Sequence, residues 1–185
     1  MKLSAAAALV GIPDDFRPAK IGDPYNYRTK IFVRNREYIR IFLLQDGSLY
    51  SKEYGYMAKT DGGRLTPDSS VSRGPAILVY YQDGSPSSQA WAREGEIHRD
   101  SSNGPALVKY HKDGDMYSAE YRNGGRLHRP RKRGPALYYE RGSGDIYFGF
   151  WEDGICIAEF EGPILKDYDQ PLEFFESSYK KVRRS

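Results

Sequence analysis

The sequence predicts an all-β fold: a single-layer antiparallel β-sheet built from repeated hairpins, with an extended N-terminal arm and a short C-terminal helix. The tripeptide Gly-Pro-Ala occurs at 74–76, 104–106 and 134–136, a constant spacing of 30 residues. Tyrosine, glycine and proline number 16, 19 and 11 among 185 residues, as expected where many short strands alternate with turns. We therefore expect one domain built from copies of a 30-residue unit.

Each copy is predicted to hold a hairpin and a short third strand. In one copy, residues 106–111 and 116–122 read as paired strands, and Asp113-Gly114 between them favours a tight turn. Residues 126–129 read as the third strand. A lone hairpin cannot bury its apolar face, so each copy is expected to pack against its neighbours. The expected copies, named first to fourth, span 38–73, 74–103, 104–133 and 134–163.

The first copy is degenerate. Gly63 aligns with the later Gly-x-Leu-His segments after five extra residues, and Gly74 follows two residues late. The spacing predicts that this copy still forms the same hairpin.

The chain ends differ from the repeats. Residues 1–37 are expected to form an N-terminal arm and lead-in, because residues 1–30 are rich in proline and small residues. The apolar start is too short for a membrane span, so we expect an arm or short helix there. In residues 164–185, Asp169 could cap a helix whose stripe would be Leu172, Phe175, Tyr179 and Val182. That helix is expected to cover the open end of the sheet or to dock on a partner.

Aromatic residues recur at strand positions and are predicted to form rows that either build the core or meet a protein partner. The partner-binding candidates in these rows are Tyr80, Tyr110 and Tyr138, together with Trp91, Tyr121 and Trp151, which recur at a spacing of 30. The same spacing aligns Tyr147 with Tyr117 on the return strands. A further candidate is the basic run Arg131, Lys132 and Arg133. This run reads as a solvated loop, or as a patch for an acidic protein, nucleic acid or membrane.

Residues that could carry chemistry are few. His98 and His128 hold one position in two copies, and we expect each to hydrogen-bond a neighbouring turn rather than a metal. Cys156, the single cysteine, lies between two isoleucines and reads as a small buried hydrophobe. No nucleophile, phosphate-loop or zinc-protease motif occurs. We therefore expect no enzyme activity, no cofactor and no small-molecule substrate.

The string Gly-Pro-Ala, Tyr, Asp-Gly, Trp and Gly-x-x-His-Arg resembles MORN-like repeats, best over 74–151 and loosely over 38–163. The resemblance implies antiparallel sheets that act as interaction or scaffolding modules. This variant is similar to diverged copies found in large DNA viruses and bacteria. It departs from the main pattern in its period of 30 and in lacking paired glycines, so it bears on the fold more than on an activity.

The functional hypothesis is a non-enzymatic structural or interaction protein in a larger assembly, such as a minor capsid or cement component of a virion. The alternatives are a regulatory binder, antitoxin-like or host-targeting, and a membrane- or nucleic-acid-associated scaffold. The net charge of +3 does not make the chain a polycation. One cysteine allows no internal disulfide, which favours a reducing, cytoplasmic location over secretion. The resemblance to viral repeats implies a virion as the other expected location.

Overall fold

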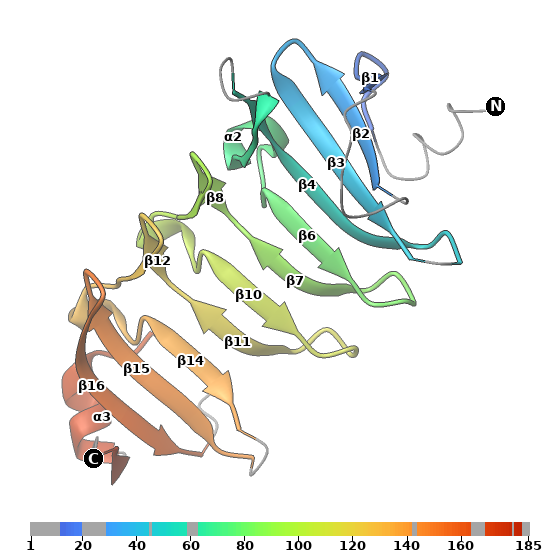
Figure 1. Ribbon diagram of the computed structural model, residues 1–185. Helices are drawn as coiled ribbons and strands as arrows, with labels where there is room; N and C mark the ends of the chain where they lie inside the picture. Colours follow the sequence, from blue (N-terminus) through green and yellow to red (C-terminus); the bar gives the residue numbers. More distant parts are fainter. Residues whose placement is uncertain are drawn as a thin grey trace. The chain divides into compact units, whose positions relative to one another are not determined.

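The computed structural model describes residues 12–19, 29–44, 46–58, 63–141, 144–163, 169–178 and 180–182. The chain divides into two compact units, unit 1 (residues 1–95) and unit 2 (residues 96–185). Each unit contains an open antiparallel sheet of hairpins, and unit 2 ends in a short helix (Figure 1). The predicted mostly β fold with a C-terminal helix is confirmed. The boundary between the units falls inside the second copy.

Unit 1 is a run of hairpins in chain order. Its sheet has the order β1-β2-β3-β4-β6-β7, with β5 paired to the far end of β4. The elements are β1 (Arg17–Ala19), β2 (Thr29–Arg34), β3 (Glu37–Leu43), β4 (Leu49–Met57), β5 (Leu65–Pro67), α2 (Ser69–Ser72), β6 (Ile77–Tyr80), β7 (Pro86–Ala90) and β8 (Ala92–Arg93).

Unit 2 repeats this plan. Its sheet has the order β10-β11-β14-β15-β16-β17, and β12 and β13 form a separate short pair. The elements are β9 (Glu96–Ile97), η2 (Ser101–Asn103), β10 (Leu107–Tyr110), β11 (Met116–Glu120), β12 (Arg122–Asn123), β13 (Arg126–Leu127), η3 (Arg131–Arg133), β14 (Leu137–Glu140), β15 (Ile146–Glu152), β16 (Ile155–Gly162), α3 (Leu172–Ser178) and β17 (Lys180–Lys181).

The predicted hairpin turns share one geometry. At the third copy, the Gly114 amide donates to the His111 carbonyl at 3.0 Å, and the Asp113 carboxylate accepts from the Asp115 amide. Gly114 has a φ of +96°, which a residue with a side chain rarely adopts. The same amide–carbonyl bond closes the turns at Gly47, Gly84 and Gly144. One local structure therefore recurs in all four copies.

The two matched histidines do hold neighbouring turns, as predicted. His98 Nδ1 accepts from the Gly124 amide at 3.2 Å, and His128 Nδ1 accepts from the Asp153 amide at 3.1 Å. In the first copy, the Asp68 carboxylate takes this place and accepts from the Glu94 amide at 3.0 Å. The position requires a hydrogen-bond acceptor rather than a histidine as such.

Asp68 also corrects the predicted alignment of the first copy. Asp68 lies 14 residues after Tyr54, whereas His128 lies seven after Tyr121, so all seven extra residues precede Asp68. They lengthen the arm that β4 forms with β5, in which Gly55 pairs with Pro67 and Met57 with Leu65. The prediction had placed five extra residues before Gly63 and two after it, because the local Gly-x-Leu match was misleading.

The fourth copy is shorter by one residue in its hairpin. In the third copy, Lys109 pairs with Ser118 and Tyr110 with Met116, which leaves Tyr117 as an extra residue in a β-bulge. The fourth copy pairs its hairpin strands, β14 and β15, without a register shift. Residues after this point are therefore displaced by one position relative to the third copy.

Trp151 is the residue that this shift moves. The Arg99 amide donates to the Arg122 carbonyl, and the equivalent Arg129 amide donates to the Trp151 carbonyl. Trp151 thus stands where Arg122 stands one copy earlier, not where Tyr121 stands. The predicted row of Trp91, Tyr121 and Trp151 is therefore wrong for Trp151, which lies on the opposite face.

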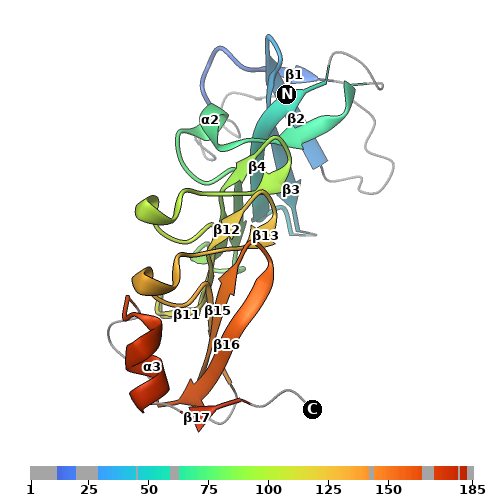
Figure 2. The same ribbon diagram turned by 90° about the vertical axis from the view of Figure 1, so that its left-hand side faces the viewer.

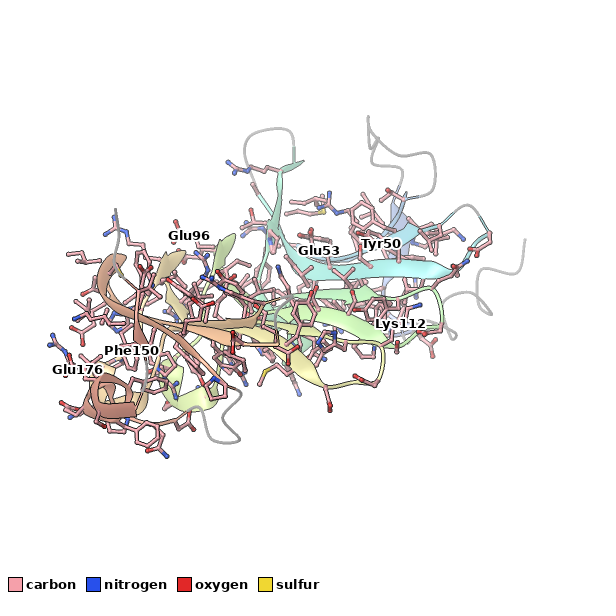
Figure 3. The ribbon with its side chains drawn as sticks, turned by 90° about the horizontal axis from the view of Figure 1, so that it is seen from below. Tyr50, Glu53, Glu96, Lys112, Phe150 and Glu176 are labelled. Carbon is pink, nitrogen blue, oxygen red and sulfur yellow. The ribbon has the colours of Figure 1, made fainter. Side chains whose placement is uncertain are left out.

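In each unit a terminal segment covers one face of the sheet. In unit 1, Ile12 and Phe16 pack on Phe32, Ile39 and Ile41. In unit 2, α3 lies on one face (Figure 2) and its Phe175 packs among the rings of β15 and β16. Phe150 of β15 lies next to α3, whereas Glu176 on that helix is exposed (Figure 3).

The predicted C-terminal helix forms but ends earlier than expected. Leu172 and Phe175 are buried as predicted, but the helix stops at Ser178 and the chain then forms strand β17 beside β16. Val182 therefore does not belong to the helical stripe, and Tyr179 lies outside the described residues. So do residues 1–11, where an arm or short helix was expected. Among the described residues, no helix is both long and apolar enough to cross a bilayer.

Candidate interaction surface

The face of the unit 2 sheet opposite α3 is not covered by a helix in the described part of the chain (Figure 2). Strand pairing places two cross-strand rows of β14, β15 and β16 on this face: Tyr139, Tyr147 and Glu161, then Leu137, Gly149 and Glu159. Trp151 follows Gly149 on the same side. We call this surface, comprising Leu137, Tyr139, Arg141, Tyr147, Gly149, Trp151, Glu159 and Glu161, the open face.

Aromatic and arginine side chains of the open face contact one another. The rings of Tyr139 and Tyr147 are stacked, with centroids 4.9 Å apart and planes inclined by 26°. The Arg141 guanidinium lies 5.5 Å from the Tyr147 centroid and pairs with Glu161 at 3.0 Å. Stacking of this kind holds both rings in place, and Tyr139 stays half-exposed whereas Tyr147 is buried.

A buried polar pair anchors the centre of the open face. The Tyr147 hydroxyl donates to the Glu159 carboxylate, and both residues are buried. Burial, and then the hydrogen bond to Glu159, raises the pKa of Tyr147 above its usual value. The phenol therefore stays a neutral donor at physiological pH, and it satisfies a carboxylate that would otherwise be costly to bury.

Trp151 and Gly149 fit against each other. A Cβ atom added at Gly149 would lie 2.7 Å from the Trp151 Nε1 atom and 3.4 Å from Tyr147 Cε1. Only glycine leaves room for the indole to lie over the strand here. The result is a platform of Trp151, Tyr147 and Tyr139, in which Trp151 and Tyr139 are half-exposed.

The third copy shows that the sheet does not need aromatic residues at these positions. The residues that match Tyr139, Tyr147, Gly149 and Trp151 are Lys109, Ser118, Glu120 and Arg122, by pairing and backbone hydrogen bonds. Those residues are polar, and the same hairpin forms around them. The aromatic platform of the fourth copy is therefore an addition to the common fold.

The predicted aromatic candidates do not form one exposed surface. Tyr138 is 3 % exposed, belongs to the core under α3 and donates its hydroxyl to the Met116 sulfur. Tyr121 is also buried and carries the Arg129 guanidinium 3.8 Å from its ring centroid. Tyr80, Tyr110 and Trp91 are half-buried. Of the six candidates, Trp151 alone lies on the open face.

Sequence reasoning missed Tyr139, Tyr147 and Arg141. Tyr139 directly follows a candidate on the chain, but alternation sends its side chain to the other face of the strand. The doubled tyrosine at 138–139 was a signal for two aromatic faces in one strand. Tyr147 was aligned with Tyr117, which the bulge removes from the register.

The basic run is partly neutralised. Arg131 pairs with Glu152 at 3.1 Å, and hydrogen bonding with Glu152 raises the pKa of Arg131. Arg133 reaches the Ser101 hydroxyl at 3.5 Å, and Lys132 is exposed. The equivalent 3-10 turn of the second copy, η2, is Ser101–Asn103. Because η2 forms without basic residues, the three basic side chains of η3 are not required for the fold.

Other chemical groups do not gather into a reactive centre. No group of three metal-ligating side chains occurs within the described residues. His111 pairs with Glu140 at 2.8 Å and packs on Tyr117. Cys156, predicted to be a small buried hydrophobe, is half-buried rather than fully buried, and its neighbour Ile155 is exposed.

No family model matches this chain, and no curated protein gives a significant match. The resemblance to MORN-like repeats remains a hypothesis that rests on the repeated residues alone.

Proposed function

We propose that this chain is a non-enzymatic protein-interaction module that binds a partner protein through the open face of unit 2. One observation carries the proposal: Tyr139, Tyr147 and Trp151 stand where the third copy has Lys109, Ser118 and Arg122. The first copy also has a ring at the Tyr139 position, Phe42, but no other copy has an aromatic residue at the positions of Tyr147 and Trp151. Folding explains a repeated residue, but it does not explain these two rings, which only the fourth copy adds.

The composition of the open face supports a protein as the ligand. Tyrosine, tryptophan and arginine are the residues that dominate the energetics of protein interfaces. On the open face these residues are held in place before binding, by the Tyr139–Tyr147 stack and by the Arg141–Glu161 ion pair. Side chains that are already ordered lose less conformational entropy when a partner binds.

The setting we favour is a larger assembly, in which the chain joins neighbouring subunits. A virion, with the chain as a minor capsid or cement component, is the specific form of this proposal that the repeat resemblance suggests. A regulatory binder of a single partner uses the same surface and differs in stoichiometry.

The experiment compares capture by the full chain and by the double variant Tyr139→Lys and Trp151→Arg. Both substitutions install the residue of the third copy, and Tyr147 is kept because its hydroxyl satisfies Glu159. Purification from the native source should recover one partner at fixed stoichiometry with the natural chain. We expect the double variant to lose at least 90 % of that recovery while its circular dichroism is unchanged.

The matched control replaces Arg131, Lys132 and Arg133 by the Ser-Ser-Asn of the second copy. This variant should retain the partner. Equal recovery by the double variant and the natural chain would refute the open face as the binding surface. Loss with the basic-turn variant alone would move the interface to η3.

A further inference from the structure

The outer edge of β16 already accepts an added strand. The chain's own β17 pairs with it antiparallel, with Lys180 opposite Glu161 and Lys181 opposite Phe160. The Val182 amide extends the ladder by donating to the Glu159 carbonyl at 2.8 Å. This edge is thus a working strand-addition site, with the C-terminal tail as its occupant.

A β-bulge limits the site at one end. Phe150 pairs with Ala158 and Trp151 with Cys156, so Ile157 is an extra residue on β16. A bulge on an edge strand twists its backbone groups out of line and discourages pairing. The regular part of the edge, residues 158–162, is the part that β17 meets. Ile155, beyond the bulge, is 67 % exposed.

The site selects by charge. Glu159 and Glu161 project from this part of β16 onto the open face, at the edge where a further strand would lie. Opposite charges directly across two strands stabilise the pair. The tail meets this requirement with a lysine opposite Glu161, and Lys180, Lys181, Arg183 and Arg184 make it basic throughout.

The tail is a short occupant. It contributes two register pairs and one further backbone hydrogen bond in the described residues. Strand ends with few buried contacts open locally far more readily than a core strand does. A longer strand of matching charge could therefore take its place.

We propose that the edge of β16 at residues 158–162 binds an extended, basic segment of the partner protein by β-strand addition, and that residues 180–182 occupy this edge in the free chain. The inference rests on the proposed function, because the edge borders the open face and the partner supplies the strand. Backbone hydrogen bonds give the affinity, and Glu161, which lies opposite Lys180, gives the preference for a basic side chain. Glu159 is buried with the Tyr147 hydroxyl and lies opposite Val182, so it contributes its backbone carbonyl.

The test uses the full chain and a fluorescent peptide with the sequence of residues 179–185. Val182→Pro removes the amide that donates to Glu159, so it should release the tail and let the peptide bind at least tenfold more tightly than it binds the natural chain. Val182→Ala keeps the amide and should behave as the natural chain does. A peptide methylated on its Val182 nitrogen should lose at least tenfold in affinity.

Equal peptide binding by the Val182→Pro and Val182→Ala variants would overturn the proposal, as would full binding of the methylated peptide. A peptide with both lysines replaced by glutamate should also bind at least tenfold more weakly. Concentration-dependent dimers of the natural chain, abolished in Val182→Pro, would show that two copies exchange tails and would overturn the assignment to a separate partner. The peptide assay needs no partner protein. A negative result in it would therefore refute strand addition at β16 without refuting partner binding by the open face, which the capture experiment tests.

Discussion

Phe175 is the side chain through which α3 stabilises unit 2. Its ring is fully buried, and its centroid lies 4.9 Å from Phe148, 5.0 Å from Phe150 and 5.9 Å from Phe160. Replacing a fully buried phenylalanine with alanine costs about 3–5 kcal/mol, since apolar burial is lost and a cavity remains. We expect Phe175→Ala to lower the free energy of unfolding of unit 2 by this amount.

The assay is equilibrium unfolding in urea, in a Trp91→Phe background so that the fluorescence of Trp151 reports on unit 2. Phe174→Ala is the matched control, because Phe174 is on the same helix and is only half-buried. Its expected cost is below about 1.5 kcal/mol. If the two variants lose the same stability, α3 does not pack on the sheet through Phe175 and the account of this core is wrong.

Three further predictions concern stability. His98→Ala should cost about 1 kcal/mol in thermal unfolding, whereas His98→Asp should cost less than half of that, because Asp68 fills the same role; equal losses would refute the shared role. Glu53→Ala should lower the free energy of urea unfolding by about 2–4 kcal/mol, and Glu53→Gln should lower it clearly less. The reason is that Glu53 accepts hydrogen bonds from the buried Tyr38 hydroxyl at 2.5 Å and from Arg40 at 2.9 Å. Equal losses for the two variants would contradict this role of Glu53. Burial, and then the charge of a nearby tyrosine, raises the pKa of Tyr54 to about 12, above its unfolded value of about 10. Its contribution is therefore complete below pH 10 and lost as the pH rises towards 12, and Tyr54→Phe should flatten this alkaline fall in stability.

The repeat made much of the fold predictable. Glycine at the hairpin turns, and His98 and His128 in the second and third copies, have local backbone roles, and residues with local roles keep their spacing. The C-terminal helix was predictable from its apolar stripe, because Leu172 and Phe175 face the sheet. Its end was not, because the switch to strand β17 depends on pairing with β16 rather than on local sequence.

The candidate surface was harder to predict for a physical reason. A missing bulge residue changes the spacing by one, and a shift of one residue moves a strand side chain to the opposite face. The constant spacing of 30 thus assigned Trp151 to the row of Tyr121, although the backbone places it with Arg122. The position of the seven extra residues before Asp68 was predicted wrongly for a similar reason. A longer hairpin arm has no sequence signal that shows where the extra residues lie.

The distinction between core and added aromatic residues can be measured directly. The measurement is the free energy of urea unfolding of the double variant Tyr139→Lys and Trp151→Arg, compared with that of Phe175→Ala. Both are followed by circular dichroism, because Trp151→Arg removes the fluorescent reporter of unit 2. Both replaced side chains are half-exposed, and the third copy folds with the new residues, so we expect a loss below about 1.5 kcal/mol, less than half that of Phe175→Ala. A loss equal to or greater than that of Phe175→Ala would mean that these rings belong to the core, which would contradict the assignment of the open face to binding.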